Sequence, residues 1–283
     1  MSDLIHSLGW QLAFLPAAAA VVAVMAWRGM LGQRALDRGP TRDLDLSPLE
    51  ASGGALLAAL TVLLMTVTTS ALEPWGLAAL AGPLQMLGLL GLIGVFFMLF
   101  FRPAMVEGGY RKIGLLPRRP LRDVEVAALA VPVAVILASG LTILFMLVGQ
   151  AIGLPAPLDA QAGHQTLVEL QQSTDLGKIL QILLFAAVIA PVLEELCFRG
   201  VMQTSLLALG GTDRRWFALA TTATIFGLIH DSALTSWHGI PALIGLGLVF
   251  GYVYERTGSL LCCFLVHAGF NAWNLTLVLA SRG

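Results

Sequence analysis

Charged residues are scarce in this sequence. Asp, Glu, Lys and Arg make up 12% of its 283 residues, against about a quarter in soluble globular proteins. Apolar residues make up 57%, and the mean hydropathy is +0.84. So small a charged fraction cannot cover the surface of a 30 kDa protein in water. The composition therefore excludes a soluble enzyme and indicates an integral membrane protein.

An excess of basic charge is also lacking. The sequence has 16 Lys and Arg against 17 Asp and Glu, whereas a nucleic-acid-binding protein needs clustered cations that neutralise several phosphates. We therefore expect no nucleic-acid partner. Cysteine is equally rare, and Cys197, Cys262 and Cys263 lie in apolar runs without CxxC spacing. They are expected to be buried apolar side chains rather than metal ligands or disulfides.

Long apolar runs fill most of the chain. A bilayer core of roughly 30 Å is crossed by about 20 apolar helical residues, and on this criterion we predict an all-α, polytopic membrane bundle of about eight transmembrane helices. The first run is not expected to be a cleaved signal peptide, because Met1 to Gly9 contains no basic residue. The predicted spans are Gly9–Trp27, Ala51–Leu72, Gly76–Phe101, Val126–Gly153, Lys178–Leu209, Trp216–His230, Gly239–Tyr254 and Leu260–Ala280.

The basic residues alternate with these spans. They cluster after the first, third, fifth and seventh runs, and the connections in between have none. Because Lys and Arg in short loops favour the cytoplasmic side, this pattern predicts both termini on the non-cytoplasmic side of the membrane. The clustered residues are Arg28, Arg34, Arg38 and Arg42, then Arg102, Arg111, Lys112, Arg118, Arg119 and Arg122, then Arg214 and Arg215, and finally Arg256.

Three ionisable residues interrupt the fifth run. A charge at a helix centre costs at least about 2.5 kcal/mol on insertion scales, so such residues are retained for a purpose. Glu195 and Arg199 are four residues apart, in the favourable order for an ion pair on one helix face. Glu194 lies about 100° around the helix and needs another partner. Pro191, one turn earlier, lacks a helical donor and is expected to kink or widen the helix.

Two other runs carry polar groups of matching chemistry. His230 ends one run, and His267 and Asn271 share a face of the last. A carboxylate and an imidazole can together take a proton from water, and an imidazole and an amide can stabilise an oxyanion. Glu194, His230 and His267 can alternatively hold Zn²⁺ with an open position, although HExxH is absent. Either arrangement predicts a hydrolase, with Glu194 and His230 within about 10 Å of each other.

These residues fall into three motifs. Glu194 to Arg199 has the form EExxxR, Phe226 to His230 has FxxxH, and His267 to Asn271 has HxxxN. In this order they resemble the motifs of the CAAX prenyl endopeptidase family, in the bacterial-type branch also called Abi or bacteriocin-processing. The resemblance covers about Lys178 to Ala280. It implies N-terminal transmembrane helices and basic cytoplasmic loops over residues 1–125 and a catalytic membrane domain over residues 126–283.

The resemblance also implies roles for individual residues. Glu194 and His230 would activate water, His267 and Asn271 would stabilise the oxyanion, and Glu195 and Arg199 would support the site. Members of the family have been described as metalloproteases and as glutamate-type proteases without metal. We favour the second, with no cofactor; if zinc is bound, its ligands would be Glu194, His230 and His267.

The predicted function is that of an intramembrane endopeptidase. It would hydrolyse a peptide bond in a membrane-associated peptide or protein, lipid-modified or not, with membrane lipid as its surroundings. The alternative is a non-catalytic membrane regulator or bacteriocin-immunity protein on the same scaffold. A transporter is disfavoured, because the two halves show no matched pair of broken helices.

Overall fold

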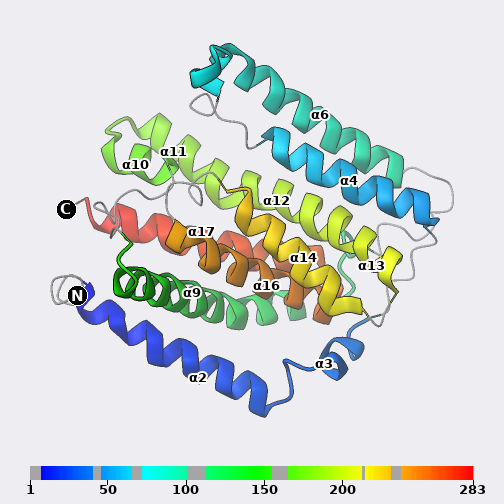
Figure 1. Cartoon of the computed structure of the whole chain (residues 1–283), viewed down its shortest axis with the longest axis horizontal. Coiled ribbons are helices and arrows are strands. Elements are labelled where there is room, and N and C mark those ends of the chain that lie inside the picture. The colour runs from blue at the N-terminus through cyan, green and yellow to red at the C-terminus, as the bar shows by residue number, and fades with distance from the viewer. Residues whose placement is uncertain are drawn as a thin grey trace.

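The computed structural model describes residues 8–40, 46–65, 72–100, 113–154, 165–211, 214–230 and 237–282. Over these ranges the chain forms helices and no strand (Figure 1). The predicted all-α fold is therefore confirmed for the part described. Besides the helices named below, short 3-10 turns lie at η2 (Glu73–Trp75), η3 (Ala78–Leu80) and η7 (Trp237–Gly239).

The N-terminal helices lie at two edges of the bundle. Helix α2 (Phe14–Trp27), preceded by η1 (Gly9–Ala13), packs on α9 (Pro120–Ala151). Helices α4 (Pro48–Met65) and α6 (Ala81–Phe100) lie side by side at the opposite edge in Figure 1. Of this pair, α4 contacts the C-terminal region. The short helix α3 (Gln33–Asp37) lies between α2 and α4 in the chain.

The centre of the bundle is built from the C-terminal helices. Helices α14 (Arg215–Leu228), α16 (Ile240–Thr257) and α17 (Leu260–Ala280) pack on one another or on α9. Gly258 ends α16 with φ of 63°, a left-handed conformation that suits glycine. The Ser259 side chain then accepts a hydrogen bond from the Cys262 backbone N–H and caps α17.

The remaining long segment changes its helix type several times. After α10 (Gln165–Gln172) it runs through α11 (Leu176–Leu184), a π turn η4 (Phe185–Ile189), α12 (Ala190–Glu195), a second π segment η5 (Leu196–Gln203) and α13 (Thr204–Gly210). Upstream of Pro191 this segment is mostly exposed, whereas η5 is almost wholly buried. The widened turns lie on either side of the two adjacent glutamates.

Four helical stretches in the part of the chain described are long and apolar enough to cross a membrane. They are Gly9–Trp27, Pro120–Ala151, Leu176–Gly210 and Leu260–Ala280. The other four predicted spans coincide with α4, α6, α14 and α16, which are helices but are not among these four stretches of the described residues. Helix α14 has 14 residues, about 21 Å, and is shorter than the bilayer core. The predicted count of eight spans is not confirmed.

The ends of the helices sort into two sides. In Figure 1 the start of α2 and the end of α17 lie on the left, and α3 and α13 lie on the right. The buried Arg215 donates hydrogen bonds to the carbonyls of Leu36 and Pro40, so the connections after the first and fifth predicted spans meet. Leu260 N–H donates to the Gly114 carbonyl, which joins the connections after the third and seventh spans.

Candidate active site

The two adjacent glutamates occupy the end of α12. Pro191 is the second residue of this helix and has no backbone N–H, so the hydrogen-bond ladder is interrupted three residues before Glu194. Widened π turns are frequent at functional sites, and here they flank the glutamates on both sides. Glu194 and Glu195 are about 100° apart around α12 and face different neighbours.

Glu195 lies in a buried polar network. Its Oε1 atom accepts hydrogen bonds from Arg199 Nη1 at 3.0 Å and from His267 Nδ1 at 2.9 Å. Arg199 also donates from Nη2 to the Gly247 carbonyl at 2.9 Å. Glu195 and Arg199 are both fully buried. The network ties α12, η5, α16 and α17 together and fixes the orientation of the His267 ring.

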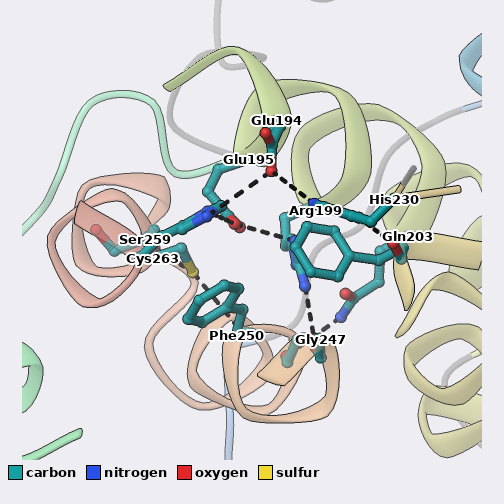
Figure 2. Close-up of polar contacts among 12 residues, drawn as sticks. Glu194, Glu195, Arg199, Gln203, His230, Gly247, Phe250, Ser259 and Cys263 are labelled. Atoms are coloured by element: carbon teal, nitrogen blue, oxygen red, sulfur yellow. Dashed lines mark hydrogen bonds and ion pairs between the residues drawn. The ribbon is translucent and has the colours of Figure 1, made fainter. Parts of the chain in front are cut away.

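Glu194 faces both histidines, and Figure 2 shows it directed towards His230. Its Oε2 atom lies 3.7 Å from His267 Nε2 and 3.9 Å from His230 Nε2. The separation from His230 is well within the 10 Å expected for a shared site. The Glu194 side chain is 30% exposed, whereas those of His230 and His267 are 18% and 4% exposed. The cluster is therefore open on the Glu194 side and closed behind His267.

The hydrogen bonds of the two Nδ1 atoms determine whether the Nε2 atoms that face Glu194 are donors or acceptors. His230 Nδ1 lies 2.6 Å from the Phe226 carbonyl, which can only accept, so Nδ1 carries the proton. His267 Nδ1 likewise faces a carboxylate that Arg199 already neutralises. In the neutral form of each ring, Nε2 then carries no proton, and its lone pair faces Glu194 Oε2. That oxygen is buried and has no hydrogen-bond partner among the residues described. Three acceptors therefore converge, and a proton donor placed among them would satisfy their lone pairs.

Asn271 is not part of this cluster in the structure. It lies one turn after His267 on α17, and its Nδ2 donates to the Ala186 carbonyl in η4 at 2.9 Å. Of the residues singled out from the motifs, the structure brings together Glu194, His230 and His267, with Glu195 and Arg199 behind them. Asn271 instead connects α17 to the turn that precedes Pro191.

Aromatic rings enclose the polar groups. The Arg199 guanidinium carbon lies 5.7, 5.0 and 5.2 Å from the ring centroids of Phe198, Phe226 and Phe250, each within cation–π range. Phe250 stacks on His267 with centroids 4.6 Å apart, and Phe226 lies 4.5 Å from His230. The rings limit water access to the network and restrict the rotation of both imidazoles.

A second buried polar set continues from Arg199 and was not predicted from the sequence. Gln203, one turn later, donates to the Gly251 carbonyl and to Glu255 Oε1. Glu255 lies 3.5 Å from Arg215. The sequence signal was a pair of four-residue repeats. One places Arg199 and Gln203 on the same helix face as Glu195. The other places their partners Gly247, Gly251 and Glu255 on one face of α16. The two glycines mark close helix packing, as their spacing suggests, and their carbonyls also accept these hydrogen bonds.

The cluster matches a metal site in its donor types, because Glu194, His230 and His267 suit zinc. Within the residues that the structure describes, however, no three His, Cys, Asp or Glu side chains are arranged to hold a metal ion.

Residues 176–273 match the profile of a protein family described as "Type II CAAX prenyl endopeptidase Rce1-like". The matched segment contains all three motifs and every residue of the cluster. No curated protein and no solved structure matches the chain.

Proposed function

We propose that the chain is an intramembrane endopeptidase with Glu194, His230 and His267 as catalytic residues, because residues 176–273 match the model of the type II CAAX prenyl endopeptidase family. The observation that carries this proposal is the position of Glu194 Oε2 between two imidazole Nε2 atoms, at 3.7 and 3.9 Å. Two of the four apolar stretches of membrane-spanning length, Leu176–Gly210 and Leu260–Ala280, carry Glu194 and His267. The substrate is then a peptide bond in a membrane-associated chain.

Glu194 and His230 activate the attacking water. Two acceptors 3.9 Å apart can both hold one water molecule at about 2.8 Å. Water has the two protons that the converging lone pairs require. Its oxygen attacks the scissile carbonyl carbon while one proton passes to Glu194. When the C–N bond breaks, that proton goes to the leaving nitrogen, and the products are an amine and a carboxylic acid, which keeps the second water proton until it ionises.

His267 stabilises the oxyanion formed by this attack. Its Nδ1 is held by Glu195, so its Nε2 donates only when the ring is an imidazolium. In that state Arg199 and the imidazolium balance the two carboxylates, and the buried cluster has no net charge, which limits the desolvation cost. The oxyanion then receives a charge-assisted hydrogen bond from Nε2. Asn271 is proposed as a further oxyanion donor through the N–H that Ala186 does not occupy.

Glu194→Gln tests the proposal without a known substrate, because it keeps the shape of the side chain and removes the base. Protein termini are compared in membranes from cells expressing the wild type, Glu194→Gln, or the matched control Glu73→Gln, whose side chain is exposed in η2. We expect new termini with the wild type and the control, and a fall of about 10² to 10⁴ in their rate of formation with Glu194→Gln. Identical termini in all three, with each protein folded, would contradict proteolysis and favour the regulator.

A defined peptide separates the two hydrolytic mechanisms. The family name suggests a quenched fluorescent peptide that ends in a prenylated CAAX sequence, added to the purified protein in vesicles. The glutamate mechanism, with no cofactor, predicts that cleavage persists after treatment with a zinc chelator such as phenanthroline. Loss of cleavage that added zinc restores would instead assign Glu194, His230 and His267 as ligands of a zinc ion that activates the water.

A further inference from the structure

The Ala186 carbonyl has lost both of its helical donors. In an α-helix it would accept from the N–H of Ala190, but this N–H donates to the Phe185 carbonyl in the π turn. In a continued π turn it would accept from residue 191, and that residue is Pro191, which has no N–H. A buried or half-buried carbonyl without a partner carries a desolvation cost.

Asn271 supplies the missing donor from another helix. Its Nδ2 lies 2.9 Å from the Ala186 oxygen, a normal length for a neutral N–H···O bond. The same seam between α17 and the start of the glutamate-bearing segment is packed by Ile182 and Leu275, both buried. This packing therefore holds Asn271 next to the turn whose carbonyl accepts its hydrogen bond.

This bond connects the two helices that carry the reacting groups. On one helix, Ala186 is eight residues, about two turns, before Glu194. On the other, Asn271 is four residues, about one turn, after His267. An N–H···O bond between Asn271 and Ala186 thus sets the distance between the helix that carries the base and the helix that carries His267. The 3.7 Å separation of Glu194 Oε2 and His267 Nε2 depends on that distance.

We propose that Asn271 is a positioning residue: its side-chain amide replaces the backbone donor that Pro191 lacks and thereby holds Glu194 at His267. This inference rests on the proposed endopeptidase function. The positioning role is compatible with an oxyanion role, because the Asn271 amide has two N–H groups and donates one of them to Ala186.

A double-mutant cycle tests the proposal, because Pro191→Ala restores a backbone N–H that can reach Ala186. Asn271→Leu keeps the approximate volume and removes the donor. We expect it to lower kcat with little change in KM. In the Pro191→Ala background the same substitution should lower kcat by about fivefold less, the factor that one neutral hydrogen bond represents. Equal losses of kcat in both backgrounds would overturn the positioning role and leave Asn271 as an oxyanion donor alone.

The thermal midpoint in detergent supplies a readout that needs no activity. Asn271→Leu should lower the midpoint more in the native background than in Pro191→Ala. If the midpoints show this coupling while no variant cleaves any substrate, the bond is supported and the endopeptidase proposal fails. Should Pro191→Ala not fold, Asn271→Asp is compared with Asn271→Leu at low pH. The protonated carboxyl can donate to Ala186 and should give the higher midpoint, whereas equal midpoints would contradict the proposal.

Discussion

At the scale of single residues, the Glu195–Arg199 pair is expected to matter both for stability and for the orientation of His267. Both side chains are fully buried and 3.0 Å apart. Arg199→Met leaves the Glu195 carboxylate buried without its main counter-charge, which is expected to lower the free energy of unfolding by about 3 to 5 kcal/mol. Cleavage of the substrate falls as well, because His267 is then held by an unbalanced carboxylate. Denaturant unfolding in detergent and the peptide assay measure the two effects.

The double variant Glu195→Met with Arg199→Met distinguishes these contributions. Replacing both charges with apolar side chains removes the unpaired ion, so most of the stability should return. Activity should stay low, since the His267 Nδ1 atom has lost its acceptor. Recovery of activity together with stability would show that the pair has no part in orienting His267.

The ion pair behind the cluster was predictable, because helical periodicity constrains two residues of one helix. A spacing of four residues places Glu195 and Arg199 on one face, and the structure has this ion pair. The contact from Asn271 to Ala186 was not predictable, because it arises from the interplay of a π turn and a proline on a different helix. Gln203 and Glu255 were missed for a similar reason: the partner of Gln203 lies 52 residues away on another helix.

At the scale of elements, the packing of α16 on α14 depends on the absence of a side chain at Gly247. A Cβ there would lie 2.9 Å from Ala223 Cα and 3.1 Å from Ala223 Cβ, so the helices must separate. Gly247→Ala is therefore expected to cost about 1 to 3 kcal/mol of stability. It should also slow cleavage, because the Gly247 carbonyl that holds Arg199 moves away with α16. Thermal unfolding and the peptide assay report both changes.

Gly53→Ala in α4 is the matched control. A Cβ at Gly53 meets nothing within 4 Å, and alanine in an open helical position stabilises by about 0.4 to 1 kcal/mol. Equal effects of the two substitutions would show that α16 and α14 can separate at no cost and would contradict the packing argument.

The extent of each helix was partly predictable from the length of its apolar run. Leu260–Ala280 coincides with the prediction, because Ser259 caps its start. The α14 run was predicted through His230, whereas the helix ends at Leu228. The apolar run could not show this, since Ile229 is apolar and a histidine does not interrupt a run defined by the absence of Asp, Glu, Lys and Arg. Nor could it show the π segments around Pro191, because a widened turn changes hydrogen bonding without changing composition.

At the scale of the whole molecule, the basic connections meet at one end of the bundle. The Tyr254 hydroxyl donates to the Ile113 carbonyl, and Arg256 donates to the Ala35 carbonyl. Arg215 and Glu255 are buried beneath the same connections. The first half of the chain therefore closes this end over the helices that carry the site. We expect this end to face the cytoplasm, as the positive-inside rule predicts.

Labelling of single cysteines in intact cells tests this orientation. The native cysteines Cys197, Cys262 and Cys263 are buried, so they contribute little background to a membrane-impermeant maleimide. Cysteines are introduced at Glu73, Arg118 and Ser281, which are all exposed.

If the basic end is cytoplasmic and the chain crosses an even number of times, Glu73→Cys and Ser281→Cys react from outside and Arg118→Cys reacts only after permeabilisation. Reaction of Arg118→Cys from outside would invert the orientation. Protection of Ser281→Cys alone would instead require an odd number of crossings after Glu73, which would make the count of eight wrong. Because α14 is about 21 Å long, it is the predicted span whose crossing this outcome would first call into question.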